Sequence, residues 1–164
     1  MRNILKITAA ATAVVAFSGS AALAQVSADG DASITIQEAL TITAVDELLF
    51  GTVVAPATGD GSLAVTVDPA APTGDQQAGT FDLTGEEGEA VNINLPADGV
   101  VDLTRDGGVE TIAVTAFTSD QAGETLTLGA GGDTIAIGAT ATVAEEQVAG
   151  LYEGTYTVEV EYAP

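Results

Sequence analysis

Carboxylates are the reactive side chains in which this sequence is rich. It has 24 Asp and Glu among 164 residues, but no His and no Cys, and Lys6 is its one lysine. An imidazole base, a thiolate nucleophile and a zinc site of His or Cys ligands are therefore excluded. Paired carboxylates can hydrolyse glycosides, but a sugar cleft is normally lined with aromatic side chains, which make up only 4% of this sequence. The composition predicts a protein that is not an enzyme.

Calcium is the metal ion that suits a ligand set made only of oxygen atoms. The candidate ligands are Asp29, Asp31, Asp60 and Asp133, each of which stands beside a glycine. None of their segments has the pattern of a twelve-residue calcium-binding loop. Because Asp and Gly also form turns without any ligand, both a calcium site and plain turns remain open. No other cofactor is expected.

The first 24 residues have the three zones of a secretory signal peptide. Arg2 and Lys6 form a basic region, residues 7–17 are apolar, and Ala22-Leu23-Ala24 is a small-x-small cleavage site. The apolar run is well short of the roughly 20 residues that a membrane-spanning helix needs. We expect cleavage after residue 24, which leaves residues 25–164 as one exported domain without a membrane segment.

Removal of this segment makes an acidic protein more acidic. The formal charge changes from −21 to −23, because Arg2 and Lys6 leave while no acidic residue does. Arg105 is then the one basic side chain, and we expect it to pair with Asp102 or Asp106 in a turn. Nucleic acids and anionic lipids are bound through Lys and Arg, so neither is expected as a partner. Such a charge also keeps a protein soluble and monomeric in salt.

Alternating apolar and polar residues predict an all-β protein, because they recur in short runs separated by turn residues. About ten such runs at roughly ten-residue spacing are typical of an antiparallel sandwich or a small barrel. A helical turn is expected only at 144–148. The predicted strands are 33–43, 48–54, 62–67, 79–83, 90–95, 100–103, 110–117, 125–128, 134–143 and 154–162.

The first predicted strand has one irregularity. Its apolar residues are Ile34, Ile36, Leu40 and Ile42. They share one face of a continuous strand only if Glu38 also points inward, and otherwise a bulge must redirect the chain. Both alternatives stay open. The last predicted strand, 154–162, ends the chain, and as an unprotected edge it would invite pairing with another molecule.

The C-terminal residues carry a resemblance to a known family. Residues 149–154 read Ala-Gly-Leu-Tyr-Glu-Gly and lead into the last strand, which looks like the tyrosine corner of immunoglobulin-like sandwiches, where a Tyr bonds back to nearby backbone. Further motifs are Leu40-Thr41-Ile42-Thr43, Leu49-Phe50-Gly51-Thr52-Val53, Val67-Asp68-Pro69 and Gly79-Thr80-Phe81. With these motifs, the chain resembles small exported proteobacterial proteins classed as domain of unknown function number four-four-zero-two. That family in turn looks similar to spore-coat-U-like and chaperone-usher pilin subunits.

The resemblance implies an immunoglobulin-like, pilin-like antiparallel β-sandwich, exported by a Gram-negative bacterium to its periplasm, its surface or the medium. Pilin subunits assemble when the N-terminal strand of one molecule completes a sheet of the next. Residues 25–31 are too few and too polar to be such a strand. An exchanged strand would therefore be 32–43, with Ile34, Ile36, Leu40 and Ile42 as its buried side chains. The pilin-type cysteine pair is absent.

Two functions follow from these patterns. The first is a non-enzymatic structural protein that associates with itself, or with other surface proteins, as a cell-surface or fibre subunit. The second is a monomeric periplasmic or secreted module whose acidic loops bind calcium or a carbohydrate. Exchange of the first strand would favour the first function, and a calcium site among the acidic candidates would favour the second.

Overall fold

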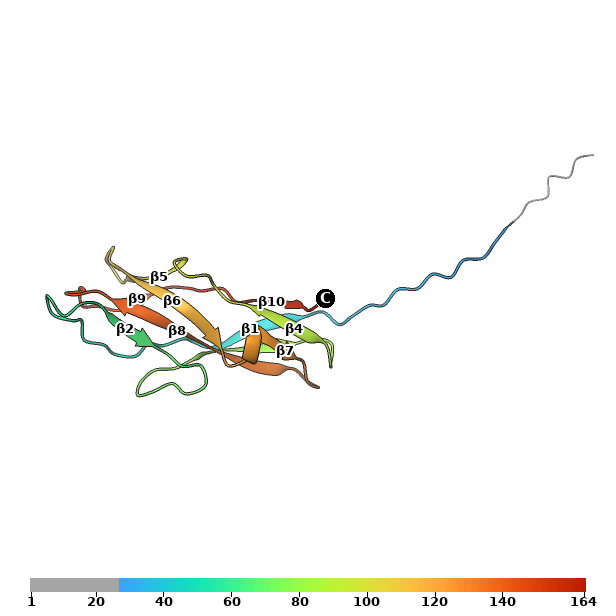
Figure 1. The fold of residues 1–164 in the computed structure, drawn as a ribbon, viewed down its shortest axis with the longest axis horizontal. Coiled ribbons are helices and arrows are strands. Elements are labelled where there is room, and N and C mark those ends of the chain that lie inside the picture. The colour runs from blue at the N-terminus through green and yellow to red at the C-terminus, as the bar shows by residue number, and fades with distance from the viewer. Residues whose placement is uncertain (1–26) are drawn as a thin grey trace, which may run out of the picture. The chain divides into compact units, whose positions relative to one another are not determined.

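The computed structural model describes residues 27–164, which contain ten strands and one short 3-10 helix (Figure 1). Residues Thr35–Pro164 form one folded unit. Residues 27–34 precede it and contain no strand or helix. The expected signal peptide and its cleavage site lie outside the described residues.

The strands form two antiparallel sheets, so the predicted all-β sandwich is confirmed. The larger sheet has the order β1-β3-β8-β6-β5-β9, with β2 pairing with a second part of β8, and the smaller sheet has the order β10-β4-β7. The elements are β1 (Thr41–Asp46), β2 (Leu63–Thr66), β3 (Gly79–Thr84), β4 (Ala90–Asn94), β5 (Val101–Arg105), β6 (Thr111–Ser119), η1 (Ala122–Glu124), β7 (Thr125–Thr127), β8 (Asp133–Val143), β9 (Tyr152–Glu153) and β10 (Glu159–Tyr162).

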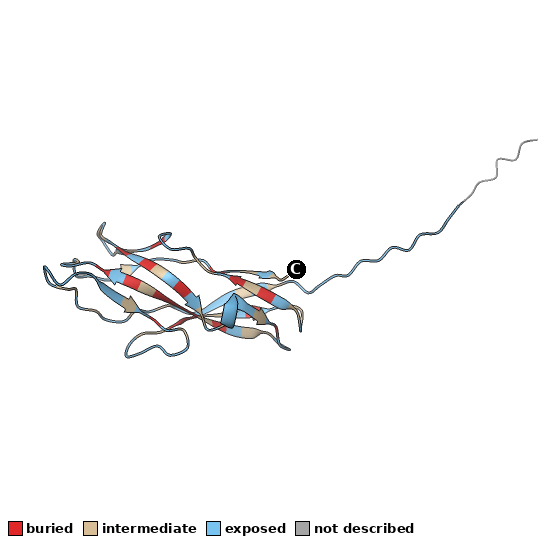
Figure 2. Cartoon of the chain, in the orientation of Figure 1, coloured by how far each residue is buried: buried red, intermediate tan, exposed pale blue. Residues whose placement is uncertain are grey.

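The main core lies between the two sheets and follows the alternation in the sequence. In β8, Ile135 and Ile137 are fully buried, and in β4 of the opposite sheet Val91 and Ile93 are buried while their neighbours are more exposed. Figure 2 shows this alternation of buried and exposed positions along the strands. Because successive side chains of a strand point to opposite faces, one apolar residue in two is enough to build this core.

A bulge in β6 changes which side chains point into the core. Pairing with β8 is irregular between Thr115 and Thr118. Within the bulge Ala116 has a φ of 51°, and its N–H donates to Asp98 Oδ1 at 2.6 Å. The extra residue turns Phe117 inward, where its ring lies 5.5 Å from that of Tyr156.

The first predicted strand, 33–43, is wrong in its N-terminal part. Residues 33–40 belong to no strand, and β1 begins at Thr41 and continues to Asp46. The irregularity expected at Glu38 is found instead in the pairing of β1 with β3, between Ala44 and Asp46.

Glu38 neither points inward nor lies in a bulge. It is exposed, its N–H donates to Glu86 Oε2 at 3.1 Å, and its carbonyl oxygen accepts a hydrogen bond from Tyr162 Oη at 2.9 Å. The Tyr162 hydroxyl also accepts the N–H of Glu86 at 2.7 Å. Side chains thus satisfy the backbone of Glu38 in place of a sheet ladder, and a strand is not needed there.

Three more predictions need correction. Residues 48–54 form no strand, because Gly51 has a φ of 77° and interrupts the extended backbone. Residues 144–148 contain a turn rather than a helical turn, because Glu146 has a left-handed φ of 50°. Residues 154–158 are unpaired, because the chain there passes from β9 in the larger sheet to β10 in the smaller one. The other predicted strands are confirmed, with shifted ends.

The predicted pairing of Arg105 with Asp102 or Asp106 is also wrong, since its ion-pair partner is Glu110. Its Nε donates to Glu110 Oε2 at 2.7 Å, and its backbone N–H bonds to the carbonyl of Glu110 at 2.9 Å. Residue 105 therefore faces residue 110 across the β5–β6 turn, whereas Asp102 lies three positions away on the strand and points to the other face. The ion pair lowers the pKa of the Glu110 carboxyl and raises that of the Arg105 guanidinium.

Candidate functional site

The larger sheet is covered in different ways along β8. Residues 133–137 of β8 pair with β3, and residues 140–143 pair with β2. The smaller sheet packs over the first part. Over the second part Ile112, Ala141 and Val143 form a separate cluster, which includes no described residue of β10, β4 or β7. Two segments cover this second part: residues 48–55, which belong to no strand, and residues 147–152, of which only Tyr152 lies in a strand, at the start of β9.

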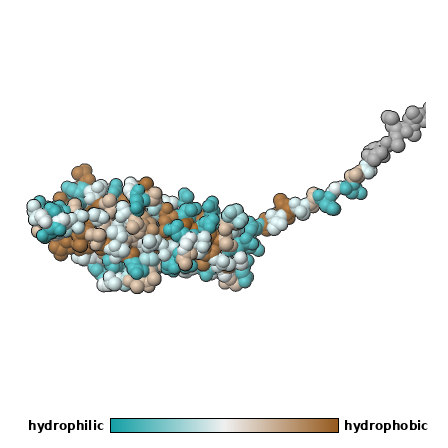
Figure 3. Space-filling model, viewed as in Figure 1, coloured by the Kyte–Doolittle hydropathy of each residue, from teal (hydrophilic) through white to brown (hydrophobic). Residues whose placement is uncertain are grey.

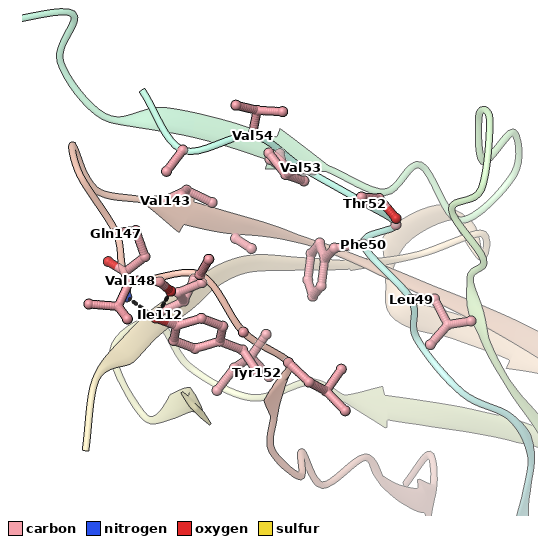
Figure 4. A pocket seen from close by; sticks show the side chains of 18 of the residues that line it. Leu49, Phe50, Thr52, Val53, Val54, Ile112, Val143, Gln147, Val148 and Tyr152 are labelled. Carbon is pink, nitrogen blue, oxygen red and sulfur yellow. Dashed lines mark hydrogen bonds between the residues drawn. The ribbon is translucent and has the colours of Figure 1, made fainter. Parts of the chain in front are cut away.

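These two segments, residues 48–55 and 147–152, bound an open groove of about 600 Å³ (Figure 4). Figure 4 shows the ring of Phe50 pointing into the space between them. In Figure 3, apolar patches interrupt the polar surface of the domain on the face that is shown. The floor consists of sheet side chains, which are Val65, Leu103, Ile112, Ala141 and Val143.

The first wall, residues 48–55, is held by the chain that precedes β3. Leu49 and Gln77 exchange two backbone hydrogen bonds of 2.8 and 2.9 Å. The N–H of Thr52 donates to Asp75 Oδ2 at 2.8 Å, and this hydrogen bond from Thr52 lowers the pKa of the Asp75 carboxyl. Gly51 permits this contact, because a Cβ at that position would collide with the Asp75 carboxylate. The wall is therefore fixed without being part of a sheet.

One end of the groove is closed by contacts between its two sides. The N–H of Glu146 donates to the carbonyl of Pro56 at 2.9 Å. The adjacent carboxylate of Glu145 accepts the N–H groups of Gly59 and Gly61 at 2.9 and 2.6 Å. These two bonds lower the pKa of the Glu145 carboxyl. The walls are thus tied together at this end by backbone and carboxylate hydrogen bonds.

The second wall, residues 147–152, is held by Tyr152. Its hydroxyl donates to the carbonyl of Val148 at 2.7 Å and accepts from Gln147 Nε2 at 2.8 Å. The Gln147 amide also reaches the carbonyl of Thr111 in β6 at 3.2 Å. The bond from Tyr152 to backbone four residues earlier is the one expected of the tyrosine in the Ala-Gly-Leu-Tyr-Glu-Gly motif.

The groove suits an apolar, extended ligand. Asp75 is the one acidic residue among those that line it, although the chain as a whole is strongly acidic. Val54 and Leu151 on its rim are 86% and 62% exposed. Across the described chain, no backbone hydrogen bond is formed by Val53 or Val54. Free backbone groups beside an apolar floor are the features that allow a strand to be added.

The candidate calcium ligands are not brought together. Asp29 and Asp31 are exposed in the segment before the folded unit. Asp60 lies in the turn whose N–H groups bind Glu145, and Asp133 Oδ2 accepts the N–H of Gly129 at 2.7 Å. Within residues 27–164, no group of three or more acidic side chains is placed to hold a metal ion. Asp60 and Asp133 therefore lie in plain turns, which is the second of the two alternatives that the sequence left open.

The four candidates for strand exchange fall into two pairs. Leu40 and Ile42 are partly buried and pack against the main core of their own domain. Ile34 and Ile36 are 85% and 84% exposed. The four side chains therefore do not form one continuous apolar face that is free to leave the fold.

Sequence reasoning missed the groove because it places a strand at residues 48–54, which are the first wall, and a helical turn at residues 144–148, where the second wall begins. A signal was present, since Val53-Val54-Ala55 is a continuous apolar run that ends at Pro56 instead of alternating. Such a run does not fit a half-buried strand.

The fold and the groove define an antiparallel β-sandwich whose larger sheet is left partly uncovered. Residues 40–162 match the family described as Domain of unknown function (DUF4402), so the chain belongs to that family. No curated protein and no solved structure matches the chain. Over residues 27–164, no helix has the length and apolar character needed to cross a membrane.

Proposed function

We propose that this chain is a non-enzymatic exported structural protein that associates with itself at the bacterial surface or in the surrounding matrix. The observation that carries the proposal is the apolar groove between residues 48–55 and 147–152. Its floor of sheet side chains is an unfinished part of the sandwich core. A strand supplied by another molecule would complete that core.

The inventory of side chains supports a structural role over catalysis. The sequence contains no His or Cys, and its one lysine lies in the expected signal peptide. The groove is lined mostly by apolar residues, and its one carboxylate, Asp75, is engaged with the backbone of Thr52. The hydroxyl of Tyr152, which also lines the groove, is engaged with Gln147 and Val148, so the two side chains of the acid–base type hold the walls in place. The proposal of export rests on the three zones of residues 1–24, and a pilin-like mode of assembly rests on the resemblance stated for the family as a whole.

Sedimentation velocity of the chain beginning at Gln25 tests self-association. We expect species larger than a monomer whose proportion rises with protein concentration. Leu151→Asp, on the rim of the groove, should shift the distribution toward monomer. Val109→Asp is the matched control, because Val109 is also exposed, receives the same charge and does not line the groove.

Two results would contradict the proposal. One is a purely monomeric wild-type chain across the full concentration range. The other is an equal effect of Leu151→Asp and Val109→Asp, since added negative charge alone would then explain the weaker association. Circular dichroism of each variant separates loss of association from loss of fold.

A further inference from the structure

The segment before β1 offers two apolar side chains that the domain does not use. Ile34 and Ile36 are 85% and 84% exposed. They are separated by Thr35 and flanked by Ser33 and Gln37. In an extended chain, both isoleucines would therefore lie on one face and the polar residues on the other. This is the pattern of a strand that is buried on one side.

The segment and the groove also match in charge. Residues 32–37 carry no ionisable side chain, and the groove is lined by a single carboxylate, Asp75, which is occupied by Thr52. Most other surfaces of this acidic chain repel their copies in another molecule. Contact between residues 32–37 and the groove brings almost no like charges together.

The groove of the same molecule is out of reach. Glu38 is held by hydrogen bonds to Glu86 and to Tyr162, the last residue of β10. From there the chain passes through all of β1, which is six residues long and therefore extends roughly 17 Å, before residue 48 enters the groove. Counted back from Glu38, Ile36 reaches at most roughly 7 Å and Ile34 roughly 14 Å. A second copy has no such restriction.

The first wall of the groove can pair with an added strand. The backbone of Val53 and Val54 makes no hydrogen bond to any other described residue. An extended segment beside this wall could bond to that backbone, while its apolar side chains enter the groove at every second position. Backbone bonds then provide affinity and the pockets provide specificity.

We propose that the groove binds residues 33–37 of a second copy of this chain, with Ile34 and Ile36 packed on its floor. This inference rests on the proposed self-association and names the segment that mediates it. Leu40 and Ile42 stay in their own core, so the donated segment is shorter than the 32–43 strand that the sequence suggested. Glu38 marks its C-terminal limit.

Complementation between two variants of the chain beginning at Gln25 tests the inference. Ile34→Asp/Ile36→Asp removes the donated side chains and leaves the groove intact. Leu151→Asp alters the groove and leaves the donated segment intact. We expect each variant alone to sediment as a monomer, with association weakened roughly a hundredfold or more because two isoleucines or their site are lost. An equimolar mixture should form a dimer, since one intact segment meets one intact groove.

A control places the same charges on the other face of the segment. Ser33→Asp/Thr35→Asp should associate to within about tenfold of the wild type, because these side chains would point away from the floor. If the wild type associates, either of two results would overturn the inference. One is association of the Ile34→Asp/Ile36→Asp variant at wild-type strength, and the other is a mixture of the two variants that stays monomeric. A wild-type chain that is monomeric would instead overturn the proposed function itself.

Discussion

Gly138 is the position at which an added methyl group should do most damage to the groove. It lies in β8, between the part that pairs with β3 and the part that pairs with β2. A Cβ on Gly138 would collide with the carbonyl oxygen of Val67 and would stand 2.7 Å from Cδ and 2.9 Å from N of Pro69. These are backbone and ring atoms that follow β2, so the clash is relieved only by moving β2 away from β8.

The expected cost has three parts. Forcing a methyl group into a packed site costs about 1–3 kcal/mol. Moving Val67 stretches the 2.9 Å bond from its N–H to the carbonyl of Ala139, and both residues are buried, which adds about 1–3 kcal/mol. The restricted unfolded chain of an alanine variant returns about 0.4–1 kcal/mol. We therefore expect Gly138→Ala to lower the free energy of unfolding by about 1–6 kcal/mol.

Urea denaturation followed by far-ultraviolet circular dichroism measures this difference. Gly129→Ala is the matched control, because a Cβ there meets only Asp133 oxygens at 3.5 and 3.8 Å, which is ordinary contact. Since β2 carries Val65 on the groove floor, self-association of Gly138→Ala should also weaken under conditions in which it is folded. A loss of stability no larger than that of Gly129→Ala would refute the argument from close packing.

Three further predictions concern titration and backbone strain. Because hydrogen bonds lower the folded pKa of Glu145 below its ordinary 4.5, its contribution is complete above that pH and is lost as the pH falls. Glu145→Gln should therefore make the fall of Tm in acid less steep. An unchanged dependence of Tm on pH would count against the stabilising role of the two hydrogen bonds that Glu145 accepts from Gly59 and Gly61. Burial raises the pKa of Tyr156 to about 12, so its contribution is complete below about pH 10 and is lost as the pH rises. Ultraviolet titration should show one tyrosine ionising near pH 12, and a tyrosine titration that is complete well below that pH would contradict this. Ala116→Gly should raise the free energy of unfolding by about 0.5 kcal/mol, because relief of a left-handed alanine outweighs the entropy of glycine, and a loss in urea denaturation would oppose it.

Period-two alternation was sufficient to predict most strands, because it reports which side chains a sheet buries. β4 and β8 show this directly, since Val91, Ile93, Ile135 and Ile137 are all buried as the pattern requires. Alternation does not report pairing. Residues 33–37 alternate as well as β4 does, yet their backbone has no neighbouring strand in the domain. A pattern that fits a buried strand can therefore also mark a segment whose partner is another molecule.

The groove could not be predicted because it depends on what the smaller sheet leaves uncovered. The sequence indicates that Ile112, Ala141 and Val143 point inward, but not that β4 and β10 pack over the other part of β8. It also gives no indication that Gly51 and Glu146 take left-handed backbone angles. Those two residues turn an expected strand and an expected helical turn into the walls. The hydrogen bond of Tyr152 to nearby backbone was predictable, because it belongs to a local motif.

Strong negative charge and self-association are compatible in this chain because the proposed contact is almost free of charge. At a formal charge of −21, two copies repel at low ionic strength, and physiological salt screens the repulsion between charges that are more than a Debye length of roughly 8 Å apart. Two copies can meet through residues 32–37 of one and the groove of the other, because Asp75 is the one carboxylate that lines this contact. Other apolar contacts between copies would bring carboxylates together and would be disfavoured. On the proposed mechanism, the acidic surface thus selects one mode of contact and makes it stronger in salt, whereas a contact built on ion pairs would weaken.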